Sequence, residues 1–184
     1  MTSTTPTPAA GQPAVRLRAA AFTVVAPTLW LGLILAISFI EAPLKFQAPG
    51  ITIPLGLGIG RLVFTALNAC EIALALVTVI ALLIARRHEA VQALDARRLT
   101  GTLVAGVAVL VVKVGVVRPL LNHRSDVIVA GGDPGPSSLH AVYVGLECLQ
   151  VLLLIVTIVF AVRLLIAAAR ATATPTSSEG SAHV

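Results

Sequence analysis

Residues 140–150, with the sequence HAVYVGLECLQ, open the last long apolar segment of the chain but include four polar side chains. On a helix, His140, Tyr143, Glu147 and Gln150 would follow one another along a single stripe. A charged side chain at the centre of a bilayer costs about 2.5–3.5 kcal/mol on insertion scales, so it usually has a partner or a function. The stripe therefore indicates a binding site for an ion or a polar solute, without identifying the ligand.

Two further charged residues, Glu71 and Lys113, also stand inside apolar segments. Counted along each helix at about 1.5 Å per residue, they reach depths close to that of Glu147. We expect the three to share a buried site, which serves either as a ligand, ion or proton pathway or as a structural ion-pair network. Six other polar residues are expected to line this site: His140, Gln150, Asn68, Arg61, Tyr143 and Arg118.

The sequence indicates no catalytic residue and no particular cofactor. It contains no HExxH, paired CxxC, GxSxG or P-loop motif. His140 and Glu147 are weak candidates for metal ligands. Cys70 and Cys148 lie in apolar runs without the spacing of a metal site, so they are expected to pack as small apolar residues, with a disulfide or ligand pair as the alternative. A role other than catalysis is favoured.

The composition predicts an integral membrane protein that has the lipid bilayer as its partner. Of the 184 residues, 57% are hydrophobic and 11% are charged, and the mean hydropathy is +0.97. Soluble domains carry roughly 25% charged residues, so this chain has too little polar surface for water. The net charge of +5 does not indicate nucleic-acid binding, because the arginines flank apolar segments and do not cluster on one polar face.

The apolar segments predict an all-α bundle of four transmembrane helices in one membrane domain, residues 19–168. Segments of about 20 residues match a hydrocarbon core near 30 Å. Because residues 41–60 are rich in proline and glycine, we expect a broken, re-entrant or interfacial segment there. Arg118 and Pro119 are expected to end the third helix. The expected spans are about 20–40, 62–85, 99–117 and 140–166, with disordered tails at 1–18 and 169–184.

The basic residues predict the orientation in a plasma (inner) membrane. By the positive-inside rule, the side richer in arginine faces the cytoplasm. Both termini are therefore expected in the cytoplasm, and the long loops 41–60 and 120–139 on the outer side. The arginine-rich side holds Arg16, Arg18, Arg86, Arg87, Arg97, Arg98, Arg163 and Arg170, and the other side holds Lys45, Arg61, Arg118 and Arg124.

The second and fourth spans match at one fixed offset, which suggests an internal repeat. The first and third spans also end alike, in Ala42-Pro43-Leu44 and Arg118-Pro119-Leu120. A repeat of this kind would form two parallel helical hairpins, as in some transporters, and the alternative is a chance alignment of apolar helices. The matched residues are Arg61, Asn68, Glu71 and Thr78 with His140, Glu147, Gln150 and Thr157.

The first span and its exit resemble the start of a known membrane protein family. The residues that carry the resemblance are Trp30-Leu31-Gly32, Ser38-Phe39, Ala42-Pro43 and Phe46. The chain is similar there to small four-helix membrane proteins like transmembrane protein 205 and its bacterial relatives. His140 corresponds to a histidine at the head of a later helix in that family, but the residues after it here, Ala141-Val142-Tyr143, differ from the family's pattern. The resemblance implies a four-helix fold and no particular activity.

Three classes of function stay open on these residues. In the first, the bundle binds or conducts a small polar solute, ion or proton through a cavity that faces outward. Since one four-helix copy is small for a transporter, we expect a homodimer or a membrane partner subunit. In the second, the chain is a structural or accessory subunit whose polar network fixes helix packing. The third is a metal- or quinone-dependent membrane redox protein.

Overall fold

The structure is a computed structural model that describes residues 12–86 and 93–173. These residues are almost entirely helical, and no strand occurs among them. In chain order the elements are α1 (Gln12–Ile34), η1 (Leu35–Glu41), α2 (Ala42–Lys45), α3 (Ile53–Arg86), α4 (Ala93–Val112), η2 (Lys113–Val117), α5 (Arg118–Val129) and α6 (Leu139–Ala173).

Four helices of the described chain are long and apolar enough to cross a membrane. The segments η1 and η2 are π-helical and continue the α-helices around them, so α1, η1 and α2 form one helix and α4, η2 and α5 another. The expected all-α fold with four helices of this kind is thus confirmed. The four apolar helices are Leu17–Lys45, Ile53–Arg86, Asp95–Val129 and Leu139–Arg170.

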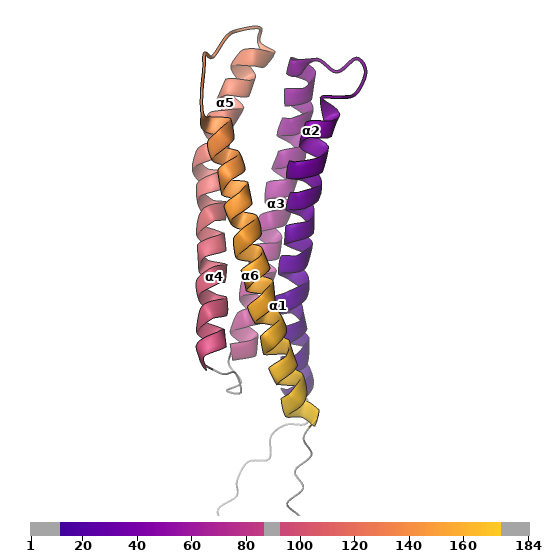
Figure 1. Ribbon diagram of the computed structural model, residues 1–184, viewed down its shortest axis with the longest axis vertical. Coiled ribbons are helices and arrows are strands. Elements are labelled where there is room, and N and C mark those ends of the chain that lie inside the picture. Colours follow the sequence, from indigo (N-terminus) through magenta and orange to yellow (C-terminus); the bar gives the residue numbers. More distant parts are fainter. Residues whose placement is uncertain (1–11, 87–92, 174–184) are drawn as a thin grey trace, which may run out of the picture.

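The four helices lie side by side in one elongated bundle (Figure 1). α1 packs against α3 and α6, and α4 packs against α6, whereas α3 and α4 touch little. The connections at residues 46–52 and 130–138 lie together at one end, which we call the loop end. The start of α1 and the end of α6 lie at the opposite end, which we call the terminal end.

The first connection is much shorter than the broken segment expected over residues 41–60. α2 extends to Lys45 and α3 begins at Ile53, so most of the glycine-rich stretch is helical. Isolated glycines weaken a helix by only about 1 kcal/mol each, and packing outweighs this cost. The second span thus begins earlier than residue 62.

Two of these glycines allow the end of the first helix to approach α3 closely. A Cβ atom at Gly56 would come within 2.3 Å of the Phe46 ring, and one at Gly60 within 2.9 Å of Lys45 Nζ. A larger residue at either position would push these side chains away. The glycines are therefore explained by close packing within a helix, not by a loop.

The third helix does not end at Arg118 and Pro119, as expected, but continues to Val129. Proline lacks a backbone N–H and its ring collides with the carbonyl four residues earlier, which usually breaks a helix. Here the backbone N–H of Arg118 bonds to the carbonyl of Lys113, five residues back, and this π-helical turn relieves the conflict. The turn before Pro43 is the same, since the N–H of Ala42 bonds to the carbonyl of Ile37. The internal repeat stays a prediction.

Helix also extends into both of the expected tails. α1 begins at Gln12 and α6 ends at Ala173, so residues 12–18 and 169–173 are helical and not disordered. Alanine and arginine, which are strong helix formers, are frequent in both stretches. The rest of the expected tails, residues 1–11 and 174–184, lies outside the described residues.

The apolar core forms two clusters along the bundle. The cluster nearer the terminal end joins α1, α3, α4 and α6 through Ala19, Leu82, Leu99 and Leu164. The other lies midway along the bundle and consists of Trp30, Ile34, Ala75, Leu110 and Leu154. Many other large apolar side chains are exposed on the outside of the bundle.

We predict that Leu154→Ala lowers the free energy of unfolding by about 2–5 kcal/mol, because it opens a cavity beside Trp30. Leu154 is 1% exposed, whereas Leu152 on the same helix is 61% exposed. Leu152→Ala is therefore the matched control, with an expected change below about 0.5 kcal/mol. Chemical unfolding in mixed micelles, followed by helical circular dichroism, measures both. Equal losses of stability would contradict this packing.

Candidate functional site: a buried ion-pair cluster beside a cavity

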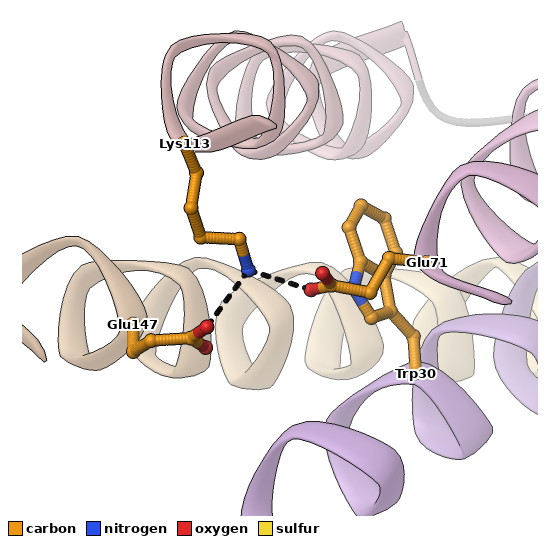
Figure 2. A network of polar contacts seen from close by, with 4 residues as sticks. All are labelled: Trp30, Glu71, Lys113 and Glu147. Atoms are coloured by element: carbon orange, nitrogen blue, oxygen red, sulfur yellow. Dashed lines mark hydrogen bonds and ion pairs between the residues drawn. The ribbon is translucent and has the colours of Figure 1, made fainter. Parts of the chain in front are cut away.

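A buried ammonium group joins two carboxylates at the centre of the bundle (Figure 2). Lys113 Nζ donates a hydrogen bond to Glu71 Oε1 at 2.7 Å and another to Glu147 Oε1 at 3.1 Å. The Trp30 indole N–H also donates to Glu71 Oε1, at 2.9 Å. We call these four residues the ion-pair cluster. The structure thus brings together the three charged residues that the sequence analysis grouped.

Each of the four long helices contributes one member of the cluster. Trp30 comes from α1, Glu71 from α3, Lys113 from the first position of η2, and Glu147 from α6. The residues next to each member along its helix are apolar, and Trp30 also belongs to the apolar cluster midway along the bundle. The cluster is therefore the point at which all four helices meet through directed polar contacts.

The cluster is sealed from solvent and carries more acceptors than its donors satisfy. The side chains of Lys113 and Glu71 are 0% exposed and that of Glu147 is 2% exposed. One ammonium faces two carboxyl groups, and the second oxygen of each, Oε2, has no hydrogen-bond partner in the described chain. Since an unsatisfied buried polar atom costs about 1–3 kcal/mol, these oxygens are available to a proton or a ligand donor.

A cavity of about 430 Å³ lies between the cluster and the loop end. Glu147 lines it, whereas the other three members of the cluster do not. The walls come from the end of the first helix, the start of α3, α5 and the start of α6. They are mainly apolar and aromatic, with Phe39, Phe46 and Phe64 among them. This volume is in the range of small-molecule sites, which are typically apolar with a few placed polar groups.

Two of the three Lys and Arg side chains in the cavity wall have carboxylate partners. Lys45 Nζ lies 3.4 Å from Glu41 Oε2, and Arg61 is paired with Asp126. The third, Arg118, is paired with no carboxylate in the described chain.

Arg118 is nevertheless 92% buried, since its exposed fraction is 8%. Its guanidinium carbon lies 5.1 Å from the centroid of the Phe64 ring, a cation–π contact, and its NH2 nitrogen has no hydrogen-bond partner in the described chain.

The remaining residues of the predicted site fall into two groups. Tyr143 and His140 both line the cavity; Tyr143 is buried with its ring edge-to-face against Phe64, whereas His140 is exposed. Asn68 and Gln150 are buried outside the cavity wall, and several of their amide atoms lack a partner in the described chain.

Metal coordination is not indicated by the described residues. Among them, no three His, Cys, Asp or Glu side chains come close enough to hold a metal ion. The pair His140 and Glu147 therefore has no third ligand there. Cys70 and Cys148 are both free and exposed, so they form neither a disulfide nor a buried ligand pair, and they lie on the outside of the bundle.

Sequence reasoning did not assign Trp30 and Phe64 to the site. Trp30 was named only among the residues that carry the resemblance in the first span, yet it is a hydrogen-bond donor of the cluster. A buried tryptophan N–H usually finds a hydrogen-bond acceptor. The chain contains one tryptophan, which lies in the middle of the first span, and Glu71 supplies the acceptor there. The sequence therefore contained a signal for this hydrogen bond. No pattern in the sequence indicated Phe64.

Comparison with known protein families, with curated proteins and with solved structures finds no match for this chain. The similarity of the first span to the transmembrane protein 205 group therefore stays a resemblance. The functional argument depends on the geometry of the site alone.

We predict that Lys113→Met lowers the free energy of unfolding by about 3–5 kcal/mol, because it leaves two buried carboxyl groups without their cation. Arg163→Met is the control, since the Arg163 side chain is 57% exposed and lies 3.9 Å from Asp95, so that this pair should contribute at most about 1 kcal/mol. Unfolding in mixed micelles measures both variants. Similar small effects would contradict a cluster that holds the four helices together.

Proposed function

We propose that this chain is a multi-pass membrane protein that binds or conducts a small polar solute, ion or proton through the cavity at its loop end. The observation that carries the proposal is the position of Glu147. Its Oε1 is hydrogen-bonded to Lys113 in the ion-pair cluster, and its side chain also lines the cavity. A solute in the cavity would therefore contact a charged network that reaches the middle of the bundle. Intramembrane ionisable groups of this kind are typically functional.

Insertion in the membrane is supported by the surface of the bundle. Large apolar side chains such as Leu62, Leu76, Val104, Val111 and Leu152 are more than half exposed on the outside. Apolar area on this scale is unfavourable in water and suits lipid. At about 1.5 Å per residue the helices exceed a 30 Å hydrocarbon core, so their ends would project into the headgroup regions. The cavity would then lie toward one interface.

The orientation follows from the basic residues at the two ends. Arg18, Arg97 and Arg163 belong to the terminal half of the bundle, together with other arginines at the ends of α3 and α6. The positive-inside rule then assigns the terminal end to the cytoplasm and the cavity to the outer face of the plasma membrane. A homodimer or a partner subunit would complete any transport path.

This topology predicts which end reacts with a membrane-impermeant maleimide in intact cells. In a background in which Cys70 and Cys148 are replaced by alanine, Asp133→Cys should be labelled, because it lies in the connection 130–138 at the loop end. Arg97→Cys at the terminal end should be labelled only after the cells are opened. The reverse pattern would contradict the orientation, and labelling of both sites in intact cells would contradict insertion as four spans.

Binding in the cavity is tested by two matched carboxylate variants. Native mass spectrometry of the detergent-solubilised protein identifies and quantifies any small molecule that copurifies. Glu147→Gln should reduce that occupancy about tenfold or more, because a charge-assisted contact in the cavity is lost. Glu71→Gln makes the same chemical change outside the cavity wall and should leave most of the occupancy. Gel filtration and circular dichroism establish that both variants are folded.

The alternative function is structural, and one observation favours it. The ion-pair cluster joins all four long helices, as a device that fixes their packing would. In that case wild-type protein carries no small molecule, and Glu71→Gln and Glu147→Gln lower the amount of folded protein equally. Such a result would replace the binding proposal by an accessory or assembly role.

A further inference from the structure

The wall of the cavity offers two groups of opposite charge that are not paired with each other. Arg118 is the cation, 92% buried by its exposed fraction of 8%, and its NH2 nitrogen is unpartnered in the described chain. Glu147 is the anion, and its Oε2 is likewise unpartnered although Oε1 is bonded to Lys113. Both side chains line the same cavity, yet they form no ion pair with each other. The site therefore offers one strong donor and one strong acceptor at separate positions.

The other cations around the cavity do not provide an equivalent donor. Lys45 is held by Glu41, and Arg61 is held by Asp126 and is 45% exposed. Arg118 is fixed instead by the Phe64 ring, at 5.1 Å from its centroid, which leaves the edge of the guanidinium free for hydrogen bonds. A planar guanidinium binds carboxylate or phosphate with two parallel hydrogen bonds. Arg118 is thus the group suited to an oxyanion.

Glu147 has the complementary preference. Its free oxygen accepts hydrogen bonds, and Lys113, seen beside it in Figure 2, already occupies the other oxygen. An ammonium group would satisfy that oxygen and would add a second cation to a cluster in which one ammonium now faces two carboxylates. The aromatic and aliphatic wall, including Phe39, Phe46 and Val144, provides room for an apolar body beside the two charges.

We infer that the ligand of this cavity is a zwitterion, with an oxyanion bound by Arg118 and an ammonium N–H donor bound by Glu147, next to an apolar body. This inference rests on the proposed function and specifies its substrate class. The same chemistry occurs in a free amino acid with an apolar side chain and in the headgroup of phosphatidylethanolamine. The experiment must therefore distinguish a free solute from a lipid.

The first arm uses the wild-type protein and three free probes. Leucine carries both charges, N-acetylleucine carries only the carboxylate, and leucinamide carries only the ammonium. Equilibrium dialysis in detergent should show leucine binding about 10- to 100-fold more tightly than either analogue, since each analogue lacks one charge-assisted contact. This comparison needs no variant and so does not depend on folding.

The second arm uses lipids in mixed micelles and native mass spectrometry. Phosphatidylethanolamine has a phosphate and an N–H donor, phosphatidylcholine has no N–H donor, and phosphatidylglycerol has no ammonium. Selective retention of phosphatidylethanolamine together with no preference for leucine would identify the lipid as the source of the zwitterion. Selective leucine binding without lipid preference would identify a free solute.

Two arginine variants assign the oxyanion contact. Arg118→Gln should weaken binding of the preferred zwitterion about 10- to 100-fold. Arg61→Gln removes a cation of the same type from the same cavity wall and should change this binding less than about threefold, because Arg61 is already paired with Asp126 and is 45% exposed. Equal losses in the two variants would overturn the role of Arg118.

The inference is overturned if neither arm shows a preference for the zwitterion, that is, if leucine binds no more tightly than N-acetylleucine or leucinamide and phosphatidylethanolamine is retained no more than phosphatidylcholine or phosphatidylglycerol. These outcomes are separable from failure of the proposed function. A molecule of another class that copurifies and is lost in Glu147→Gln would keep the binding function and exclude the zwitterion. Absence of any occupant together with absence of probe binding would remove both.

Discussion

The burial of Lys113 between Glu71 and Glu147 is the interaction on which the rest of this structure depends. An ammonium group in an apolar interior is stable only if acceptors surround it, and here two carboxylates from different helices do so at 2.7 and 3.1 Å. Trp30 extends the same network to α1. The ion-pair cluster thus links all four helices, and the apolar cluster around Trp30 and Leu154 packs beside it.

The cavity exists because the first and third helices are not regular α-helices between the ion-pair cluster and the loop end. π-Helical turns before Pro43 and Pro119 let the first and third helices continue where proline would otherwise end them. Gly56 and Gly60 let Phe46 and Lys45 lie against α3. The loop end therefore has walls built from helix, which hold Arg118 in a defined position beside the cavity.

The all-helical fold with four membrane-length helices, and the grouping of Glu71, Lys113 and Glu147, could be predicted from the sequence. Charged residues are rare in long apolar segments, so their depths alone indicated a meeting point. The helix ends at Ile53 and Val129 could not be predicted, because proline and glycine normally signal breaks and only tertiary contacts show how the conflict is relieved. The burial of Arg118 without a carboxylate partner could not be predicted either. It depends on the packing of α5 against Phe64, and no local sequence pattern indicates that packing.

The proposed site requires that the Glu147 side of the ion-pair cluster faces the cavity, whereas the Glu71 side is enclosed. The chain contains one tyrosine and one tryptophan, and they stand on these two sides. Tyr143 lines the cavity, and Trp30 contacts Glu71 away from it. Hydroxyl-radical footprinting of the wild-type protein in nanodiscs tests the claim directly. We predict that Tyr143 is oxidised faster than Trp30, because Tyr143, although buried, borders the cavity; slower or equal oxidation of Tyr143 would contradict this arrangement.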